Sequence, residues 1–166
     1  MRQYALLELR RLTLTAAGNS CVTLVACEED QQQQRCVATL DVRWPAFTAN
    51  HWPACLPLPI TDQPALLSNV VVAPSHRRRG LARHLVAAAK QAAAERFPAQ
   101  QLYAWAEADS AAALALYAAS GFAEVGRDVG LDRGLALGEQ VLLCCRLGSG
   151  GSSAHVGRCE SLSDLR

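Results

Sequence analysis

Hydrophobic and polar positions divide the chain into short apolar runs of strand length and two longer segments with a helical period. Residues 21–28 and 36–44 are apolar runs on either side of a polar, glutamine-rich segment, which predicts a hairpin with its tip at 29–35. Further runs of strand length follow at 66–73, 101–107, 122–129 and 140–147.

The helical period is clearest in residues 80–97, which Pro98 ends. One face of this segment is formed by Leu81, Leu85, Ala88, Ala89 and Ala92. A second helix is predicted over 110–120, with Asp109 or Ser110 as its cap and Gly121 as its C-terminal stop. Residues 1–12 carry a weaker pattern and predict a short helix.

In chain order the predicted strands and helices, β-β-loop-β-α-β-α-β-β, describe a single α/β domain with a mixed sheet over residues 1–147. The helix at 80–97 must cross over to the next strand, so the strands before and after it are expected to be parallel neighbours. Five prolines in residues 45–65 predict an irregular surface loop there. Residues 148–166 begin with a glycine- and serine-rich stretch and are expected to form a flexible tail.

Composition narrows the function classes. The net charge of +1 over 166 residues creates no global field that favours nucleic acid or an anionic membrane, and no apolar stretch is long enough to span a bilayer. Seven scattered cysteines predict reduced thiols in an intracellular protein, and the four histidines lack the spacing of a metal site. The N-terminus does not read as a targeting segment, so a soluble protein of the cytoplasm or an organelle stroma is expected.

The segment from Asn69 to Leu85 combines a β-branched strand, a basic turn with Gly80, and the start of a helix. The first N–H groups of a helix have no intrahelical partner, so such a turn binds anions through its backbone. Arg77, Arg78 and Arg79 add full charges, which indicates a phosphorylated ligand. The alternatives are a solvated basic face or an import signal. His76 and His84 are expected to face solvent or the phosphates.

Two motifs together resemble the GNAT superfamily of acyl-CoA N-acyltransferases. Arg77-Arg-Arg-Gly80-Leu-Ala82 matches the motif Arg/Gln-x-x-Gly-x-Gly/Ala, directly after a strand that ends Val-Ala-Pro. Ala113-Leu-Ala-Leu-Tyr117-Ala-Ala-Ser-Gly121-Phe122 matches the family's later helix. The resemblance covers roughly residues 20–147 and implies the GNAT fold: a central mixed sheet with a splayed parallel strand pair, flanked by helices. Relative to the family, the N-terminal region is shortened.

The resemblance also implies a site for acetyl-CoA as co-substrate. The pyrophosphate would lie on the backbone N–H groups of Arg77, Arg78, Arg79, Gly80, Leu81, Ala82 and Arg83. The thioester carbonyl and the pantetheine would lie on the main chain of Val70, Val71 and Val72. Ser110 stands where the family has an asparagine that contacts pantetheine, and Tyr117 stands where a tyrosine protonates the departing thiolate.

The chemistry of amide formation agrees with these assignments. The attacking amine must be neutral, and a phenol with a pKa of about 10 can serve a thiolate whose conjugate pKa is about 8.5. Relatives that acetylate protein N-termini often have a histidine where this chain has Trp105, so Glu107 is the candidate base, directly or through a water. The alternatives are that Glu107 is a surface carboxylate and that Tyr117 only packs its helix on the sheet.

The sequence therefore predicts an acetyl-CoA-dependent N-acetyltransferase in which a primary amine attacks the thioester directly, without a metal. The expected acceptor is an α-amine or a lysine of a peptide or protein. The alternatives are a small-molecule amine or amino acid as acceptor, or a non-catalytic acyl-CoA-binding module. A nucleic-acid binder is disfavoured by the near-zero net charge.

Overall fold

The computed structural model describes residues 4–9, 20–30, 33–46, 53, 55, 63–129 and 138–148. Seven strands form one sheet in the order β1-β2-β3-β4-β5-β7-β6. The strands are β1 (Tyr4–Leu9), β2 (Ser20–Asp30), β3 (Gln33–Trp44), β4 (Ala65–Val72), β5 (Gln101–Glu107), β6 (Ala123–Val129) and β7 (Glu139–Arg146). The two α-helices are α1 (Leu81–Arg96) and α2 (Ala111–Ala119).

The sheet is mixed, as the order of strands and helices predicts. β2 and β3 form the expected antiparallel hairpin, and both strands run further toward its tip than predicted, to Asp30 and from Gln33. The crossover through α1 makes β4 and β5 parallel neighbours, and the other adjacent pairs are antiparallel. The sheet is therefore two antiparallel halves joined by one parallel pair.

The predicted helix at residues 1–12 is wrong. Residues Tyr4–Leu9 form β1, which pairs antiparallel with β2 from Tyr4 opposite Glu28 to Leu9 opposite Thr23. The local helical pattern is weak, and the outer edge of β2 offers a complete row of backbone partners, so strand pairing prevails over local propensity. Residues 10–19, between β1 and β2, lie outside the described residues.

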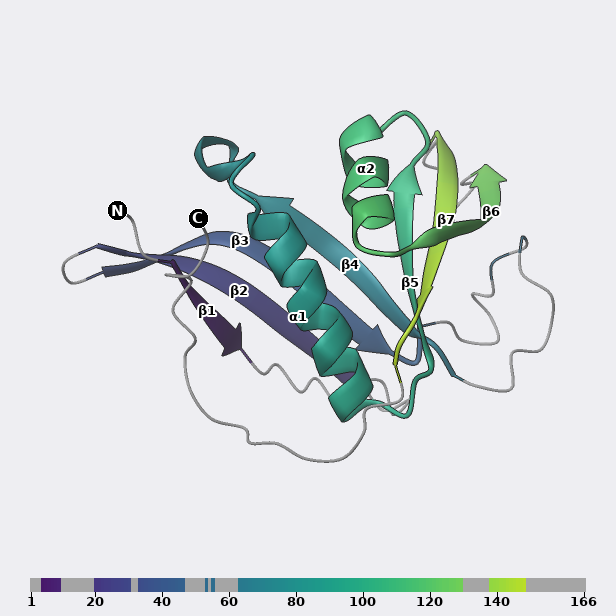
Figure 1. Ribbon diagram of the computed structural model, residues 1–166, viewed down its shortest axis with the longest axis horizontal. Coiled ribbons are helices and arrows are strands. Elements are labelled where there is room, and N and C mark those ends of the chain that lie inside the picture. The colour runs from purple at the N-terminus through teal and green to yellow at the C-terminus, as the bar shows by residue number, and fades with distance from the viewer. Residues whose placement is uncertain are drawn as a thin grey trace.

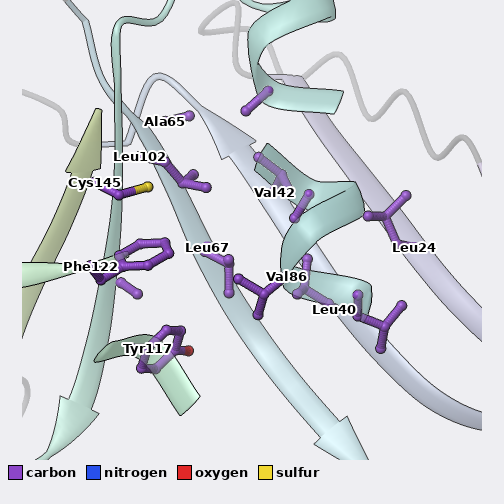
Figure 2. Close-up of a cluster of buried hydrophobic side chains, with 14 of the residues drawn as sticks. Leu24, Leu40, Val42, Ala65, Leu67, Val86, Leu102, Tyr117, Phe122 and Cys145 are labelled. Carbon is purple, nitrogen blue, oxygen red and sulfur yellow. The ribbon is translucent and has the colours of Figure 1, made fainter. Parts of the chain in front are cut away.

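The two helices lie on one face of the sheet (Figure 1). α1 packs on β2, β3 and β4, whereas α2 packs on β5. The main core forms between these helices and the sheet, and Figure 2 shows part of it. Its fully buried side chains include Leu40, Val42, Leu67, Leu85, Val86 and Leu102. The predicted apolar face of α1 is correct, with Ala88 half-buried at its margin.

A smaller cluster lies on the opposite face of the sheet. Leu66, Tyr103 and Leu142 form its centre, and Trp105 and Cys144 pack against it. Along β5 the side chains alternate, because Leu102, Ala104 and Ala106 belong to the main core while Tyr103 belongs to the smaller cluster. This alternation decides on which face each functional side chain of β5 lies.

Both ends of the proline-containing connection are attached to the domain. The indole Nε1 of Trp44 donates to the carbonyl of Gln63 at 3.0 Å, and the N–H of Ala46 donates to the carbonyl of Pro64 at 2.7 Å. Most of the predicted loop and the predicted tail from 149 onward lie outside the described residues. Among the residues described, no helix has both the length and the apolar character to span a membrane.

Candidate functional site

The parallel strands β4 and β5 separate partway along their length. Their register holds for three pairs, from Ala65 opposite Leu102 to Leu67 opposite Ala104. Beyond Leu67 the two strands diverge, and Figure 1 shows β4 and β5 running apart toward the end of the sheet where α1 begins. Along this segment, Ser68–Val72 has no strand partner on the β5 side within the described chain, so its edge can pair with an extended ligand.

A β-bulge in β4 coincides with the start of this opening. The register with β3 shifts between Thr39 opposite Val71 and Asp41 opposite Ser68, so β4 contains one extra residue. Asn69 has a left-handed backbone with φ 54°, and its side-chain Nδ2 donates to Asp41 Oδ2 at 2.6 Å. Thr23 Oγ1 donates to Asp41 Oδ1, also at 2.6 Å. One carboxylate on β3 thus connects β2 to the bulge in β4.

The bulge decides how the predicted thioester segment is presented. Val70 and Val72 pack against the main core, whereas Val71 is 57% exposed on the other side. The sequence motif indicates this segment as the candidate thioester site, but it does not single out Asp41 or Asn69. The available signal was an asparagine within a β-branched run, since asparagine is enriched among non-glycine residues with positive φ.

The basic turn follows β4 and leads into α1, as predicted. It passes through a 3₁₀ turn, Pro74–His76, and then two left-handed residues, Arg78 with φ 62° and Gly80 with φ 80°. Alternating backbone of this kind directs successive N–H groups into a concave surface that binds anions. The main chain is anchored to the sheet because the N–H of Ala73 donates to the carbonyl of Val37 at 2.8 Å.

One of the two histidines beside the turn differs from expectation. His76 is 3% exposed and lies beneath the turn, with Nδ1 2.8 Å from the hydroxyl of Ser75 and Nε2 3.2 Å from Glu28 Oε2 on β2. The expectation that it faces solvent or phosphate is therefore wrong. His84 is half-exposed, and its Nδ1 lies 2.9 Å from the carbonyl of Gly80. The His76 ring is thus buried, whereas the half-exposed His84 ring contacts the last residue of the turn.

Arg77, Arg78 and Arg79 are exposed, as is Arg83 in the first turn of α1. Arg77 bends back along β4, because its Nε donates to the carbonyl of Val72 at 3.2 Å. Leu81 is buried and Ala82 half-buried, so these two residues offer a ligand mainly their backbone. The positive charge is concentrated at the N-terminus of α1, where the helix dipole also favours an anion.

Tyr117 extends from α2 into the main core and is 5% exposed. Its ring packs against Phe122 with the centroids 5.3 Å apart, and Figure 2 shows its hydroxyl at the end of the ring that points toward β4. Burial raises the pKa of Tyr117 to about 12. Within the described residues the hydroxyl makes no hydrogen bond, and no side-chain oxygen there is both fully buried and unpartnered. The phenol therefore retains contact with solvent on the side of the opening.

Ser110 and Glu107 lie at the ends of α2 and β5. Ser110 occupies the N-cap position of α2. Its side-chain hydroxyl makes no capping hydrogen bond, so the hydroxyl is available to a ligand. Glu107 is exposed at the last position of β5. By the alternation along β5 its side chain lies on the face of Tyr103 and Trp105, opposite α2. The structure therefore places Glu107 and Tyr117 on opposite faces of the sheet.

The mixed sheet with its splayed parallel strands has counterparts among known proteins. Residues 4–122 match the acetyltransferase (GNAT) family. The chain belongs to the acetyltransferase (GNAT) family. Its fold is the GNAT fold.

Three relatives of this GNAT protein illustrate the range of acceptors. A mycothiol acetyltransferase from Cellulomonas flavigena is 48% identical over 58 residues, a match that covers 35% of this chain and only 16% of that protein. A ribosomal-protein-alanine N-acetyltransferase from Brucella melitensis is 28% identical with a TM-score of 0.56, over 76% of this chain and 69% of that one. A spermidine N-acetyltransferase from Vibrio cholerae, solved with CoA and spermine, is 15% identical with a TM-score of 0.56, over 78% and 67% of the respective chains.

The raised pKa of Tyr117 predicts the alkaline side of the pH–rate profile. Because the folded protein favours the neutral phenol, kcat is expected to show no decline from its ionisation below about pH 10. The stability that Tyr117 contributes is present below its unfolded pKa of about 10 and is lost as the pH rises through about 12. The measurement is kcat against pH with circular dichroism at each point. A decline centred below pH 10 that disappears in Tyr117→Phe would contradict the expectation.

Proposed function

We propose that this GNAT protein transfers the acetyl group of acetyl-CoA to a primary amine of a peptide or protein, an N-terminal α-amine or a lysine. The observation that carries the donor half is the continuity of three features: the unpaired edge of β4, the turn at Arg77–Gly80 and the N-terminus of α1. An extended thioester that pairs with Ser68–Val72 would have its pyrophosphate at the turn. The hydroxyls of Ser110 and Tyr117 would lie along the other side of the opening.

The reaction follows from these placements. The neutral amine nitrogen attacks the thioester carbon, the carbonyl oxygen takes up the electron pair, and the backbone N–H groups of Val70–Val72 are the candidate donors to that oxyanion. Collapse of the intermediate breaks the C–S bond and leaves CoA thiolate. The proton lost from the amine nitrogen balances the one gained by the sulfur.

The pKa of about 12 restricts the role of Tyr117. Complete transfer of its proton to a thiolate of conjugate pKa about 8.5 would be uphill by about 5 kcal/mol. Tyr117 is therefore assigned a hydrogen bond to the sulfur that strengthens as the C–S bond breaks, while the proton released by the amine reaches the sulfur through solvent.

The acceptor is assigned to the face of the sheet opposite α1 and α2, because the donor occupies the helix side. Glu107 lies on that face at the end of β5, where it can receive the amine proton directly or through a water. The half-buried Trp105 lies on the same face of β5. This surface suits a peptide better than a polyamine, which would require several unengaged carboxylates.

The acceptor test measures CoA thiol release with a matched panel: peptides with free N-terminal alanine, serine or methionine, the same peptides with blocked N-termini and an internal lysine, and spermidine. We expect turnover with at least one peptide class and little with spermidine. Turnover confined to spermidine or to free amino acids would replace the peptide proposal with a small-molecule acceptor. Absence of thiol release throughout, together with stabilisation by acetyl-CoA in a thermal shift, would contradict the assigned peptide and amine acceptors.

Tyr117→Phe tests the assigned acid. The substitution keeps the ring that packs on Phe122 and removes only the hydroxyl. We expect kcat to fall about 100-fold while the Kd for acetyl-CoA changes less than about threefold. Stopped-flow or endpoint thiol release and calorimetric titration give the two quantities. A kcat equal to that of the unmodified protein would assign Tyr117 to packing alone.

A further inference from the structure

Lys90 is the single lysine of the 166-residue chain. Of the sixteen lysine and arginine residues of the chain, all the others are arginines. It lies in the second half of α1 and is half-buried. Its Nζ donates to the carbonyl oxygen of Ser120 at 3.1 Å. Ser120 is the C-cap residue of α2, so this hydrogen bond joins the two helices.

The two helices stand on different halves of the sheet. α1 rests on β2, β3 and β4, and α2 rests on β5, while β4 and β5 are held together by only three residue pairs before they diverge. The bond from Lys90 to Ser120 therefore connects the two sides of the opening on the helix face of the sheet.

The end of α2 transmits this contact to Tyr117. The carbonyl of Tyr117 accepts hydrogen bonds from the N–H groups of Ser120 and Phe122, each at 3.0 Å. Gly121, with φ 82°, completes a Schellman motif in which its own N–H donates to the carbonyl of Ala118. A Cβ at Gly121 would lie 3.8 Å from the Lys90 ammonium, so the lysine packs directly over the motif.

Lys90 suits this position on electrostatic grounds. The last carbonyls of a helix lack intrahelical donors and carry partial negative charge, which an ammonium satisfies. The positive charge of Lys90 also acts on the thiol of Cys145 in β7. Burial raises the pKa of Cys145 to about 11, and the nearby Lys90 opposes that effect.

We propose that Lys90 is a positioning residue that fixes the C-terminal turn of α2, and with it the hydroxyl of Tyr117, relative to β4. This inference rests on the proposed role of Tyr117. Without the ammonium, the carbonyl of Ser120 loses its donor, the last turn of α2 loosens, and the phenol samples positions away from the sulfur.

The kinetic test compares Lys90→Met with Lys90→Arg, using acetyl-CoA and the amine of highest turnover in the acceptor panel. Methionine keeps an unbranched apolar chain and removes the charge and the donor, whereas arginine keeps both. We expect Lys90→Met to lower kcat about tenfold with a change in acetyl-CoA Kd below about threefold, and Lys90→Arg to recover most of kcat. Gln91→Met, on the exposed side of the same helix, is the matched control and should leave kcat unchanged.

The double variant separates positioning from general destabilisation. If Lys90 acts through Tyr117, adding Lys90→Met to Tyr117→Phe should lower kcat no further. Additive losses of kcat would contradict the proposal that Lys90 positions Tyr117, and would leave the role of Tyr117 itself unchanged. An unimpaired Tyr117→Phe would overturn the acid itself, and Lys90 could then not act through it.

The single lysine also gives a test that needs no acceptor. Nuclear magnetic resonance of protein labelled with 15N-lysine should show one ammonium signal, protected from rapid exchange because its protons are hydrogen-bonded. The Ser120→Pro variant lacks the N–H of residue 120, which disrupts the end of α2. Faster exchange of the ammonium protons in this variant would support the hydrogen bond from Lys90 to Ser120. An ammonium that exchanges freely in the unmodified protein would overturn it, even if Lys90→Met failed to fold.

Discussion

A valine at position 80 is expected to raise the Kd for acetyl-CoA by at least about 100-fold, because Gly80 holds φ 80° at the N-cap of α1. A β-branched residue is strained at positive φ, so the turn must change its backbone and redirect the N–H groups assigned to the pyrophosphate. Steric overlap within the protein is not the cause, since a Cβ there meets the ring of His84 at an ordinary 3.6 Å. Calorimetric titration with acetyl-CoA measures the loss.

Two control variants sharpen that experiment. Gly80→Asn should retain more affinity than Gly80→Val, because asparagine tolerates left-handed backbone. Gly148→Val should retain full affinity, because a Cβ at Gly148 has no neighbour within 4 Å. Undiminished binding by Gly80→Val would show that this turn does not hold the pyrophosphate.

Asn69→Val is expected to lower kcat at least about 100-fold, with acetyl-CoA binding weakened to a lesser degree. Valine cannot hold φ 54° without strain and cannot donate to Asp41, so both supports of the bulge are lost. A flattened β4 shifts by one residue and turns Val70 and Val72 away from the core, which moves the backbone groups assigned to the thioester carbonyl. Steady-state kinetics with varied acetyl-CoA separates kcat from KM.

Asn69→Gly is the matched control, because glycine adopts the left-handed backbone freely but lacks the amide donor. It should keep most of kcat. Asp41→Asn leaves the backbone of Asn69 unchanged and tests the carboxylate alone. Equal kcat for Asn69→Val and Asn69→Gly would show that the conformation at the bulge does not govern the reaction.

The regular elements could be predicted because their signals are local. The alternation in 101–107 gives β5 with the same bounds, and the apolar face with Pro98 behind it gives α1 within one residue at each end. The basic turn could also be recognised, because a strand, a glycine and a helix N-terminus that follow one another determine an anion site without distant contacts. The proposed donor half of the site therefore rests on consecutive residues.

Several features of the site could not be read in this way. Thr23 and Asn69 both donate hydrogen bonds to Asp41, and these bonds join three strands whose register no local pattern specifies. His76 reads as one more polar residue of a basic turn, yet its ring is buried against Glu28, 48 positions away. β1 forms where a weak helix is predicted, because β2 provides an edge for it.

By itself, the sequence determined the α/β order, the parallel pair around α1 and the basic turn between β4 and α1, because each depends on residues close together in the chain. Only the tertiary structure decided that β4 and β5 part after Leu67, that burial raises the pKa of Tyr117, and that Glu107 lies on the opposite face from it. The physical reason is that splaying, desolvation and strand register are set by contacts between distant segments, and those contacts exist only when the sheet has formed.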